Sequence, residues 1–247
     1  MNLTNRVAVV TGAGGGIGSA ICARLAGAGM RVVLGYNRRE EETCALANGL
    51  PGSGHMAVRV PVDDSVALRR MAQEVAERYG GVDLLVNNAG MTRFIPHEDL
   101  EDLDDDLIDQ IFRVNWRGAF ACVRALRSLL AAGEGGLVVN ISSIAATTAQ
   151  GSNVAYCASK AALNSMTMSL ARALAPSIRV ISVAPGLVEG KYAASFDPGW
   201  RQEHLDKTPL GRLATGEDVA DVVVAAVALL RLSTGCVIPV DGGRILS

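Results

Sequence analysis

The chain has 247 residues, of which 49% are hydrophobic and 19% charged, as is typical of a globular protein with a sizeable core. The net charge of −2 and the lack of a basic face argue against a nucleic-acid partner, and no apolar run is long enough to cross a membrane. Five scattered cysteines without a CxxC pair and three widely separated histidines predict neither a disulfide framework nor a metal site. Because the chain enters a strand almost at once without a signal peptide, we expect a cytoplasmic protein.

Short β-branched runs alternate with longer stretches of helical periodicity along the chain. The predicted strands cover residues 7–10, 31–36, 57–62, 83–88, 137–142, 178–184 and 236–240. The predicted helices cover residues 17–28, 40–49, 65–79, 104–132, 158–175 and 216–231. The strands are continuous apolar runs, as expected when both faces of a sheet are covered. We therefore predict an α/β fold with a doubly wound parallel sheet of about seven strands, in one domain that covers residues 1–247.

The region without clear periodicity, about 187–215, is punctuated by glycine and proline. Long loops inside compact domains are often lids or binding loops, so we expect this region to be a substrate loop.

A glycine-rich turn follows the first strand and opens the first helix, in the sequence TGAGGGIGSA at residues 11–20. Such a turn lets backbone N–H groups approach a pyrophosphate, and the N-terminus of the helix favours its negative charge. The spacing is TGxxxGxG rather than GxGxxG. The residues assigned to a dinucleotide site here are Thr11, Gly12, Gly14, Gly15, Gly16, Ile17 and Gly18.

A tyrosine and a lysine lie four residues apart in VAYCASK, residues 154–160. On a helix this spacing places Tyr156 and Lys160 on one face. A cation beside a phenol favours the phenolate and lowers the pKa of the phenol, as a general acid or base near neutral pH requires. The pair alone is also compatible with two ordinary helix residues.

Six motifs occur together in order: TGxxxGxG, NNAG at 87–90, Asn115, NISS at 140–143, YxxxK at 156–160 and APG at 184–186. With them the chain resembles the short-chain dehydrogenase/reductases over nearly its whole length. TPLGRLATGEDVA at 208–220 and TGCVIPVDGG at 234–243 are similar to the branch of beta-ketoacyl-carrier-protein reductases. The resemblance implies a Rossmann fold and hydride transfer between a nicotinamide cofactor and a carbonyl or alcohol carbon.

The resemblance also implies roles for individual residues. Ser143, 13 positions before Tyr156, would bind the substrate oxygen, and Tyr156 would act as general acid or base. Lys160 would contact the nicotinamide ribose, and Asn115 would hold a water that links Lys160 to solvent. The remaining implied cofactor contacts, besides Tyr156 and Lys160, are Val62, Asn88, Ala89, Gly90, Pro185, Gly186 and Val188.

The segment LGYNRREEE at the end of the second strand bears on the choice of cofactor. An acidic residue there would bind the ribose 2′-OH of NAD, whereas a basic one accommodates the 2′-phosphate of NADP. Tyr36 and Asn37 occupy this place and are followed by Arg38 and Arg39, while the acids 40–42 begin the next helix. We therefore expect NADP to be favoured over NAD, through Arg38 with help from Arg39.

Two positions depart from the family pattern. Pro61 stands where an aspartate usually contacts the adenine, which leaves the backbone of Val62, or Asp63 after a shift of the loop. Gly190 stands where a threonine often contacts the nicotinamide carboxamide, which leaves that contact to the backbone of Val188.

The substrate is expected to be a free small-molecule ketone or secondary alcohol. Reductases that act on an acidic carrier protein resemble one another in basic residues before the fifth strand, whereas this chain has Glu134 there. We expect Ile144, Ala145, Gln150, Asn153 and the loop after residue 186 to line the pocket. A carrier-linked beta-ketoacyl reductase and a non-catalytic dinucleotide-binding regulator are the alternatives. In the family the helix at 104–132 packs against a second subunit, which implies a homotetramer or homodimer.

Overall fold

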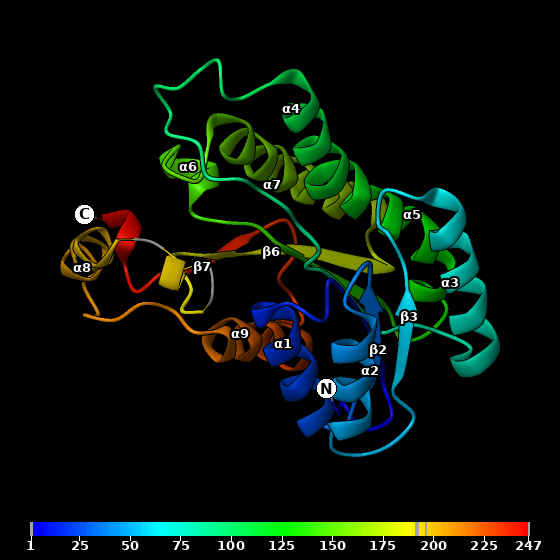
Figure 1. The fold of residues 1–247 in the computed structure, drawn as a ribbon. Coiled ribbons are helices and arrows are strands. Elements are labelled where there is room, and N and C mark those ends of the chain that lie inside the picture. Colours follow the sequence, from blue (N-terminus) through cyan, green and yellow to red (C-terminus); the bar gives the residue numbers. More distant parts are fainter. Residues whose placement is uncertain (1, 191–192, 196, 247) are drawn as a thin grey trace.

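Seven parallel strands form one sheet in the order β3-β2-β1-β4-β5-β6-β7 in the computed structural model, which describes residues 2–190, 193–195 and 197–246 (Figure 1). The strands are β1 (Val7–Thr11), β2 (Arg31–Tyr36), β3 (Met56–Arg59), β4 (Leu84–Asn87), β5 (Gly136–Ile141), β6 (Ile178–Pro185) and β7 (Val237–Val240). Since every pair is parallel, the carboxyl ends of all these strands lie at one edge. The predicted doubly wound sheet is confirmed.

Helices cover both faces of the sheet (Figure 1). One face carries α1 (Gly16–Gly27), α2 (Glu40–Gly49) and α9 (Gly216–Ala228). The other carries α3 (Ser65–Tyr79), α5 (Ala119–Leu130) and α7 (Val154–Leu174), with α4 (Asp105–Phe112) packed beside the start of α7.

The apolar strand sequences follow from this double covering. Successive side chains of a strand point to opposite faces, so every position of a central strand is buried. In β1, Ala8 and Val10 pack in the core of the first face, and Val7 and Val9 pack in the core of the second. No helix in the described residues is long and apolar enough to cross a membrane.

The segment predicted as one helix at 104–132 changes its hydrogen-bonding pattern in the middle. Between α4 and α5 it forms a π-helical stretch, Arg113–Gly118. Such stretches are rare and frequently lie at functional sites. Asn115 is in this stretch, and its buried side chain bonds to other segments rather than to its own helix.

Two predicted boundaries differ from the structure. The helix predicted at 158–175 begins at Val154, because the side chain of Asn153 accepts a hydrogen bond from Tyr156 N at 2.7 Å and caps it. The strand predicted at 57–62 ends at Arg59. Pro61, two residues later, has no N–H group with which to continue the ladder.

The region 187–215 is not a uniform loop. It contains a 3-10 turn, Ala193–Ser195, and the helix α8, Pro198–Asp206. Asp197 caps α8 by accepting from Gly199 N at 2.8 Å and Trp200 N at 3.3 Å, and Pro198 occupies the first turn. The prediction of a loop was therefore wrong for 198–206, where an Asp-Pro helix start was present in the sequence. Two short elements remain, α6 (Ala145–Thr148) and a 3-10 turn at Arg244–Leu246.

Candidate active site

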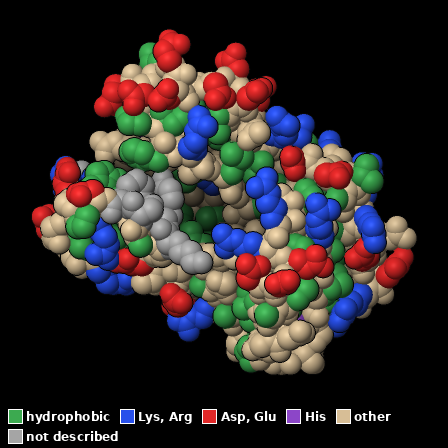
Figure 2. Space-filling view, in the orientation of Figure 1, with side chains coloured by type: hydrophobic (Ala, Val, Ile, Leu, Met, Phe, Trp, Pro, Cys, Tyr) green, Lys and Arg blue, Asp and Glu red, His purple; other side chains and the backbone are tan. Residues whose placement is uncertain are grey.

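A cleft of about 1590 Å³ lies at the carboxyl ends of the strands. Its walls come from the turn after β1, the loops after β4, β5 and β6, the start of α7, helix α8 and the C-terminal turn. In Figure 2 it is the hollow near the centre of the face, with apolar side chains at its floor. Ligands of open α/β sheets bind at this edge, near the point where the strand order reverses.

The glycine turn fits one end of this cleft closely. Gly12 has φ +66°, and a Cβ there would lie 2.9 Å from Ala89 Cα. A Cβ on Gly18 would collide with Gly12 O and lie 2.7 Å from Asn88 Nδ2. A Cβ on Gly16, by contrast, would meet no atom within 4 Å. The turn is thus packed tightly against the loop after β4 and open on the side where a phosphate would meet the N-terminus of α1, so its residues fit a dinucleotide.

Thr11 supports this turn from below rather than facing the cleft. Its side chain is buried, and Oγ1 accepts hydrogen bonds from Asn88 N at 3.1 Å and Ala89 N at 3.0 Å. Asn88 Nδ2 in turn donates to Thr11 O and Gly12 O, each at 3.0 Å. These bonds join the ends of β1 and β4.

Most of the predicted cofactor residues line the cleft. They are Gly12, Gly14, Gly15, Gly16, Ile17, Gly18, Asn88, Gly90, Tyr156, Pro185, Gly186 and Val188. The remaining six, Thr11, Asn37, Arg38, Val62, Ala89 and Lys160, are outside the lining. Val62 packs against the π-helical stretch, where a Cβ on Gly118 would lie 2.7 Å from Val62 Cγ2.

The basic residue at the adenosine end of the cleft is Arg39. Its Nη1 donates to Gly14 O at 2.9 Å, so the guanidinium lies beside the glycine turn. Arg38 is exposed and outside the lining, whereas Glu42 lines the cleft together with Arg39. The sequence prediction named Arg38 first, with help from Arg39, whereas only Arg39 lines the cleft, because the orientation of each side chain depends on how the chain turns from β2 into α2.

The predicted catalytic side chains converge where β5 ends and α7 begins. Ser143 and the half-buried Tyr156 both line the cleft, and Ser143 Oγ accepts from Ala145 N at 3.2 Å. Lys160 lies behind Tyr156, with Nζ 5.7 Å from the centre of the phenol ring. Ser142 also reaches the lining, but its buried Oγ lies 3.4 Å from Lys160 O.

The ammonium of Lys160 is deeply buried. Nζ donates to Ile141 O at 2.8 Å, and no salt bridge to Lys160 is found among the described residues. Removal from water disfavours the charged form. Burial thereby lowers the pKa of Lys160 to about 8. Ionisable groups perturbed in this way cluster at functional sites.

Asn115 lies behind the cleft and is 1% exposed. Its Oδ1 accepts from Met91 N at 2.8 Å, and its Nδ2 donates to Met91 O at 3.0 Å and Ser159 Oγ at 3.1 Å. A Cβ on Gly90 would lie 3.4 Å from Asn115 Oδ1 and 3.8 Å from Lys160 Nζ, so both side chains flank Gly90.

The two departures from the family pattern have different surroundings. Pro61 lies in a separate groove between β3 and α3. Gly190 lines the cleft with φ +147°, and a Cβ there would meet no atom within 4 Å. Space for a side chain is thus available at Gly190, although its backbone conformation favours glycine.

Of the residues expected to line the pocket, Ile144, Ala145 and Gln150 line the cleft, and Asn153 does not. Asn153 is 1% exposed and caps α7. Sequence reasoning missed the lining residues Phe94, His97 and Arg244, whereas Trp200 and His204 of α8 lie within the region 187–215 that was expected to line the pocket. The three missed residues come from the loop after β4 and the C-terminal turn, and no local motif marks them.

Comparisons with known proteins agree with this geometry. A model of the short chain dehydrogenase family matches residues 6–199. A Streptomyces violaceoruber protein, whose name assigns it as ketoacyl reductase 2 of the granaticin polyketide synthase, is 39% identical over 97% of this chain and 96% of its own. The 3-oxoacyl-(acyl-carrier-protein) reductase of Thermotoga maritima is 33% identical over the whole of both chains. A 3-ketoacyl-(acyl-carrier-protein) reductase from Brucella melitensis, solved with NADH, superposes with a TM-score of 0.89 at 29% identity, covering 98% of this chain and 99% of its own.

Replacing Lys160 with methionine should stabilise the protein at pH 7 by about 1–3 kcal/mol, since it removes a buried charge. In the folded protein the pKa of Lys160 is about 8, against an ordinary value of 10.5. Between these two pKa values the unfolded wild type binds more protons at Lys160 than the folded wild type does. The free energy of unfolding of the wild type therefore rises with pH in this range. The advantage of Lys160→Met should therefore shrink between pH 8 and 10. Urea unfolding at pH 7 and 9.5 measures this, with the exposed Lys207→Met as control. A lower stability of Lys160→Met at pH 7 would contradict the account.

Proposed function

This chain belongs to the short-chain dehydrogenase family, and from that membership and the contents of the cleft we propose that it transfers hydride between NADP(H) and a free small-molecule ketone or secondary alcohol. The observation that carries the proposal is the placement of Tyr156 in the cleft wall, with the buried ammonium of Lys160 behind its ring. As a member of this family the protein is an NAD(P)-dependent oxidoreductase that acts on CH–OH groups.

The residues that would hold the dinucleotide follow the cleft from the glycine turn to the end of β6. The turn at 12–18 would bind the pyrophosphate, and the backbone at Pro185–Gly186 and Val188 would face the nicotinamide. When bound, the nicotinamide supplies or accepts the hydride.

The protein's own task is to orient the substrate oxygen and move its proton. The Ser143 hydroxyl would donate a hydrogen bond to that oxygen and hold it near Tyr156. In reduction the Tyr156 phenol gives its proton to the oxygen as the C–O bond becomes a single bond, and in oxidation the tyrosinate takes the proton back. The Lys160 ammonium favours the tyrosinate by its charge. Asn115, which lies beside Gly90 near Lys160, would order the water that returns protons from solvent.

The preference for NADP rests on Arg39. Its guanidinium lies beside Gly14 at the end of the cleft where the adenosine would bind. A guanidinium binds a phosphate with several parallel hydrogen bonds. The last residue of β2 is Tyr36 rather than an acid. Glu42 also lines this end of the cleft, so its carboxylate would compete with a bound phosphate for the guanidinium of Arg39.

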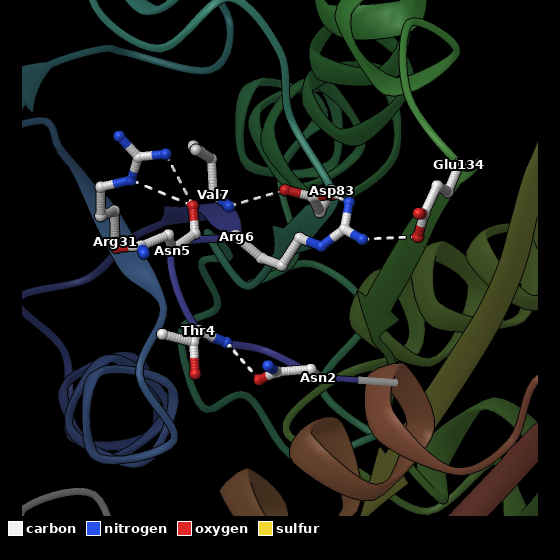
Figure 3. Close-up of polar contacts among 8 residues, drawn as sticks. All are labelled: Asn2, Thr4, Asn5, Arg6, Val7, Arg31, Asp83 and Glu134. Carbon is white, nitrogen blue, oxygen red and sulfur yellow. Dashed lines mark hydrogen bonds and ion pairs between the residues drawn. The ribbon is translucent and has the colours of Figure 1, made fainter.

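A carrier-linked substrate is the second candidate, because two of the similar proteins are named as carrier-protein reductases. From the sequence, the negative charge of Glu134 was expected to repel an acidic carrier. In the structure, however, Glu134 is ion-paired with Arg6, which also bonds to Asp83 (Figure 3). This cluster lies at the amino ends of β1, β4 and β5, opposite the cleft, so Glu134 is only a weak argument against a carrier.

We also propose a cytoplasmic homotetramer or homodimer. All five cysteines are free thiols, as is usual in a reducing compartment. On α5 and the π-helical stretch before it, the rings of Trp116 and Phe120 stack with centroids 6.1 Å apart and are each 36% exposed. An exposed aromatic pair of this kind supports packing of this helix against a second subunit.

Tyr156→Phe should lower kcat for reduction of ethyl acetoacetate with NADPH by about 10²–10⁴, since it removes the proton donor, while the Kd for NADPH changes less than about threefold. Tyr79→Phe is the matched control. The Tyr79 hydroxyl donates to Gly54 O at 2.7 Å, away from the cleft, so kcat should stay at the wild-type value. Retention of more than a tenth of the activity in Tyr156→Phe would exclude the assigned role.

Arg39→Ala and Arg38→Ala form a matched pair of neighbouring charge deletions. Arg39→Ala should weaken NADPH binding about tenfold or more and leave NADH binding within about twofold, since only NADPH has the 2′-phosphate. Arg38→Ala should change neither much. Fluorescence titration of each variant measures both constants. If Arg38→Ala produced the larger loss, the assignment of the phosphate contact to Arg39 would be wrong.

The same 3-oxobutanoyl group can be offered on N-acetylcysteamine or on an acyl carrier protein. If the natural substrate is a free small molecule, the kcat/KM values for the N-acetylcysteamine ester and the carrier-bound form should lie within about threefold of each other, because no surface of the protein would bind the carrier. An advantage of the carrier-bound form above tenfold that disappears at high salt would establish the second candidate instead.

A further inference from the structure

Two segments far apart in the sequence form adjoining parts of the cleft wall. Thr92, Phe94, Pro96 and His97 come from the loop after β4, which we call the 91–97 loop. Residues 150–152 come from the turn before α7, directly ahead of Tyr156. The position of the 91–97 loop relative to Tyr156 therefore sets the width of the substrate end of the cleft.

Asn153, which follows the turn at 150–152, bonds to the 91–97 loop and to the start of α7 at once. Its Oδ1 accepts from Tyr156 N at 2.7 Å, which caps α7. Its Nδ2 donates to Arg93 O at 2.7 Å and to Thr92 Oγ1 at 3.2 Å. The side chain is 1% exposed, so these bonds are shielded from water.

The neighbours of Asn153 add further bonds between the same two segments. Thr92 Oγ1 and Ser152 Oγ lie 2.5 Å apart, and Ile95 N donates to Ser152 O at 2.8 Å. His97 Nε2 lies 3.2 Å from Gly151 O. The 91–97 loop is thereby held along its length against residues 151–153.

A second path connects the same loop to the backbone of Tyr156. Met91 bonds to the Asn115 amide, Asn115 Nδ2 donates to Ser159 Oγ at 3.1 Å, and Ser159 Oγ donates to Tyr156 O at 2.8 Å. Asn153 and Ser159 thus hold the N–H and the C=O of Tyr156, and both paths end in the 91–97 loop. The result is a closed ring of hydrogen bonds around the backbone of Tyr156.

The type of residue at 153 distinguishes this arrangement from an ordinary helix cap. Among the described helices the other caps made by side chains are Asp64, Asp104, Asp197 and Thr215. A carboxylate or hydroxyl suffices to accept from the first-turn N–H groups. Only an amide offers an acceptor for the helix and two donors for a second segment.

We propose that Asn153 is a positioning residue that fixes the 91–97 loop to the start of α7, and so sets the substrate-binding wall relative to Tyr156. The effect on substrate rests on the proposed function of Tyr156. The hydrogen bonds from Asn153 Nδ2 to the 91–97 loop, which we call the tie, are a property of the fold and can be tested without turnover.

Three variants separate the tie from the cap. Asn153→Ser keeps an acceptor for the first turn of α7 but cannot reach Arg93 O or Thr92. Asn153→Ala removes both the cap and the tie. Asp64→Ala is the matched control, because Asp64 caps α3 through Val66 N and Ala67 N outside the cleft. Urea unfolding of all three variants first establishes that they fold.

For Asn153→Ser we expect the KM for ethyl acetoacetate to rise about fivefold or more, with kcat and the Kd for NADPH within about threefold of wild type. Asn153→Ala should lower kcat as well, because the start of α7 is then released. Asp64→Ala should lower the stability of the protein and leave both kcat and KM at their wild-type values. If Asn153→Ser kept the wild-type KM, or matched Asn153→Ala in both constants, the positioning role would be overturned.

Amide hydrogen exchange gives an independent readout. In Asn153→Ser the amide of Ile95 should exchange at least tenfold faster, while that of Tyr156 stays protected. Should Asn153→Ser fail to fold, Thr92→Val removes one acceptor of the same tie and should raise the KM and the exchange of Ile95 to a smaller extent. Unchanged exchange at Ile95 would overturn the tie. If the wild type turned over no ketone, the proposed function would fail, and the exchange result would still decide about Asn153.

Discussion

The site depends first on the close contact between the turn after β1 and the loop after β4. The strand order reverses between these two central strands, so their connections leave in opposite directions and open the crevice. Thr11 and Asn88 close the contact by exchanging hydrogen bonds with the opposite backbone. A side chain on Gly12 or Gly18 would push the two segments apart. The 91–97 loop, which bonds to Asn115 and Asn153, follows directly in the chain. The dinucleotide end and the substrate end of the cleft are therefore positioned by the same contact.

The fold is destabilised locally at Lys160, beside the proposed proton donor Tyr156. Burying the Lys160 ammonium with a carbonyl as its hydrogen-bond partner works against stability. The surroundings compensate with an ordered polar framework. On the neighbouring strands Asn87 Nδ2 donates to Asn140 Oδ1 at 2.9 Å, and Asn140 Nδ2 donates to Thr167 Oγ1 of α7 at 2.8 Å. The helix that carries Tyr156 and Lys160 is therefore fixed to the sheet by directional bonds as well as by apolar packing.

Much of this arrangement could be predicted from the sequence, because its signals are local or periodic. The glycine turn needs particular backbone space, and the spacing of Tyr156 and Lys160 needs only a helix. Most of the differences between prediction and structure depended on tertiary contacts. Whether Arg38 or Arg39 faces the cleft depends on the turn into α2. Asn153 appeared to be a pocket residue, because its partners in the 91–97 loop lie some 60 positions away in the chain. The start of α8 at Pro198 had a local signal that the predicted loop did not take into account.

A crystal structure of the protein with NADPH tests the central claim most directly, since it shows where the two ends of the dinucleotide bind. The account predicts the pyrophosphate over the glycine turn at 12–18, the 2′-phosphate at Arg39, and the nicotinamide between Tyr156 and Val188. A dinucleotide whose nicotinamide lay away from Tyr156, or whose phosphates avoided the N-terminus of α1, would contradict it.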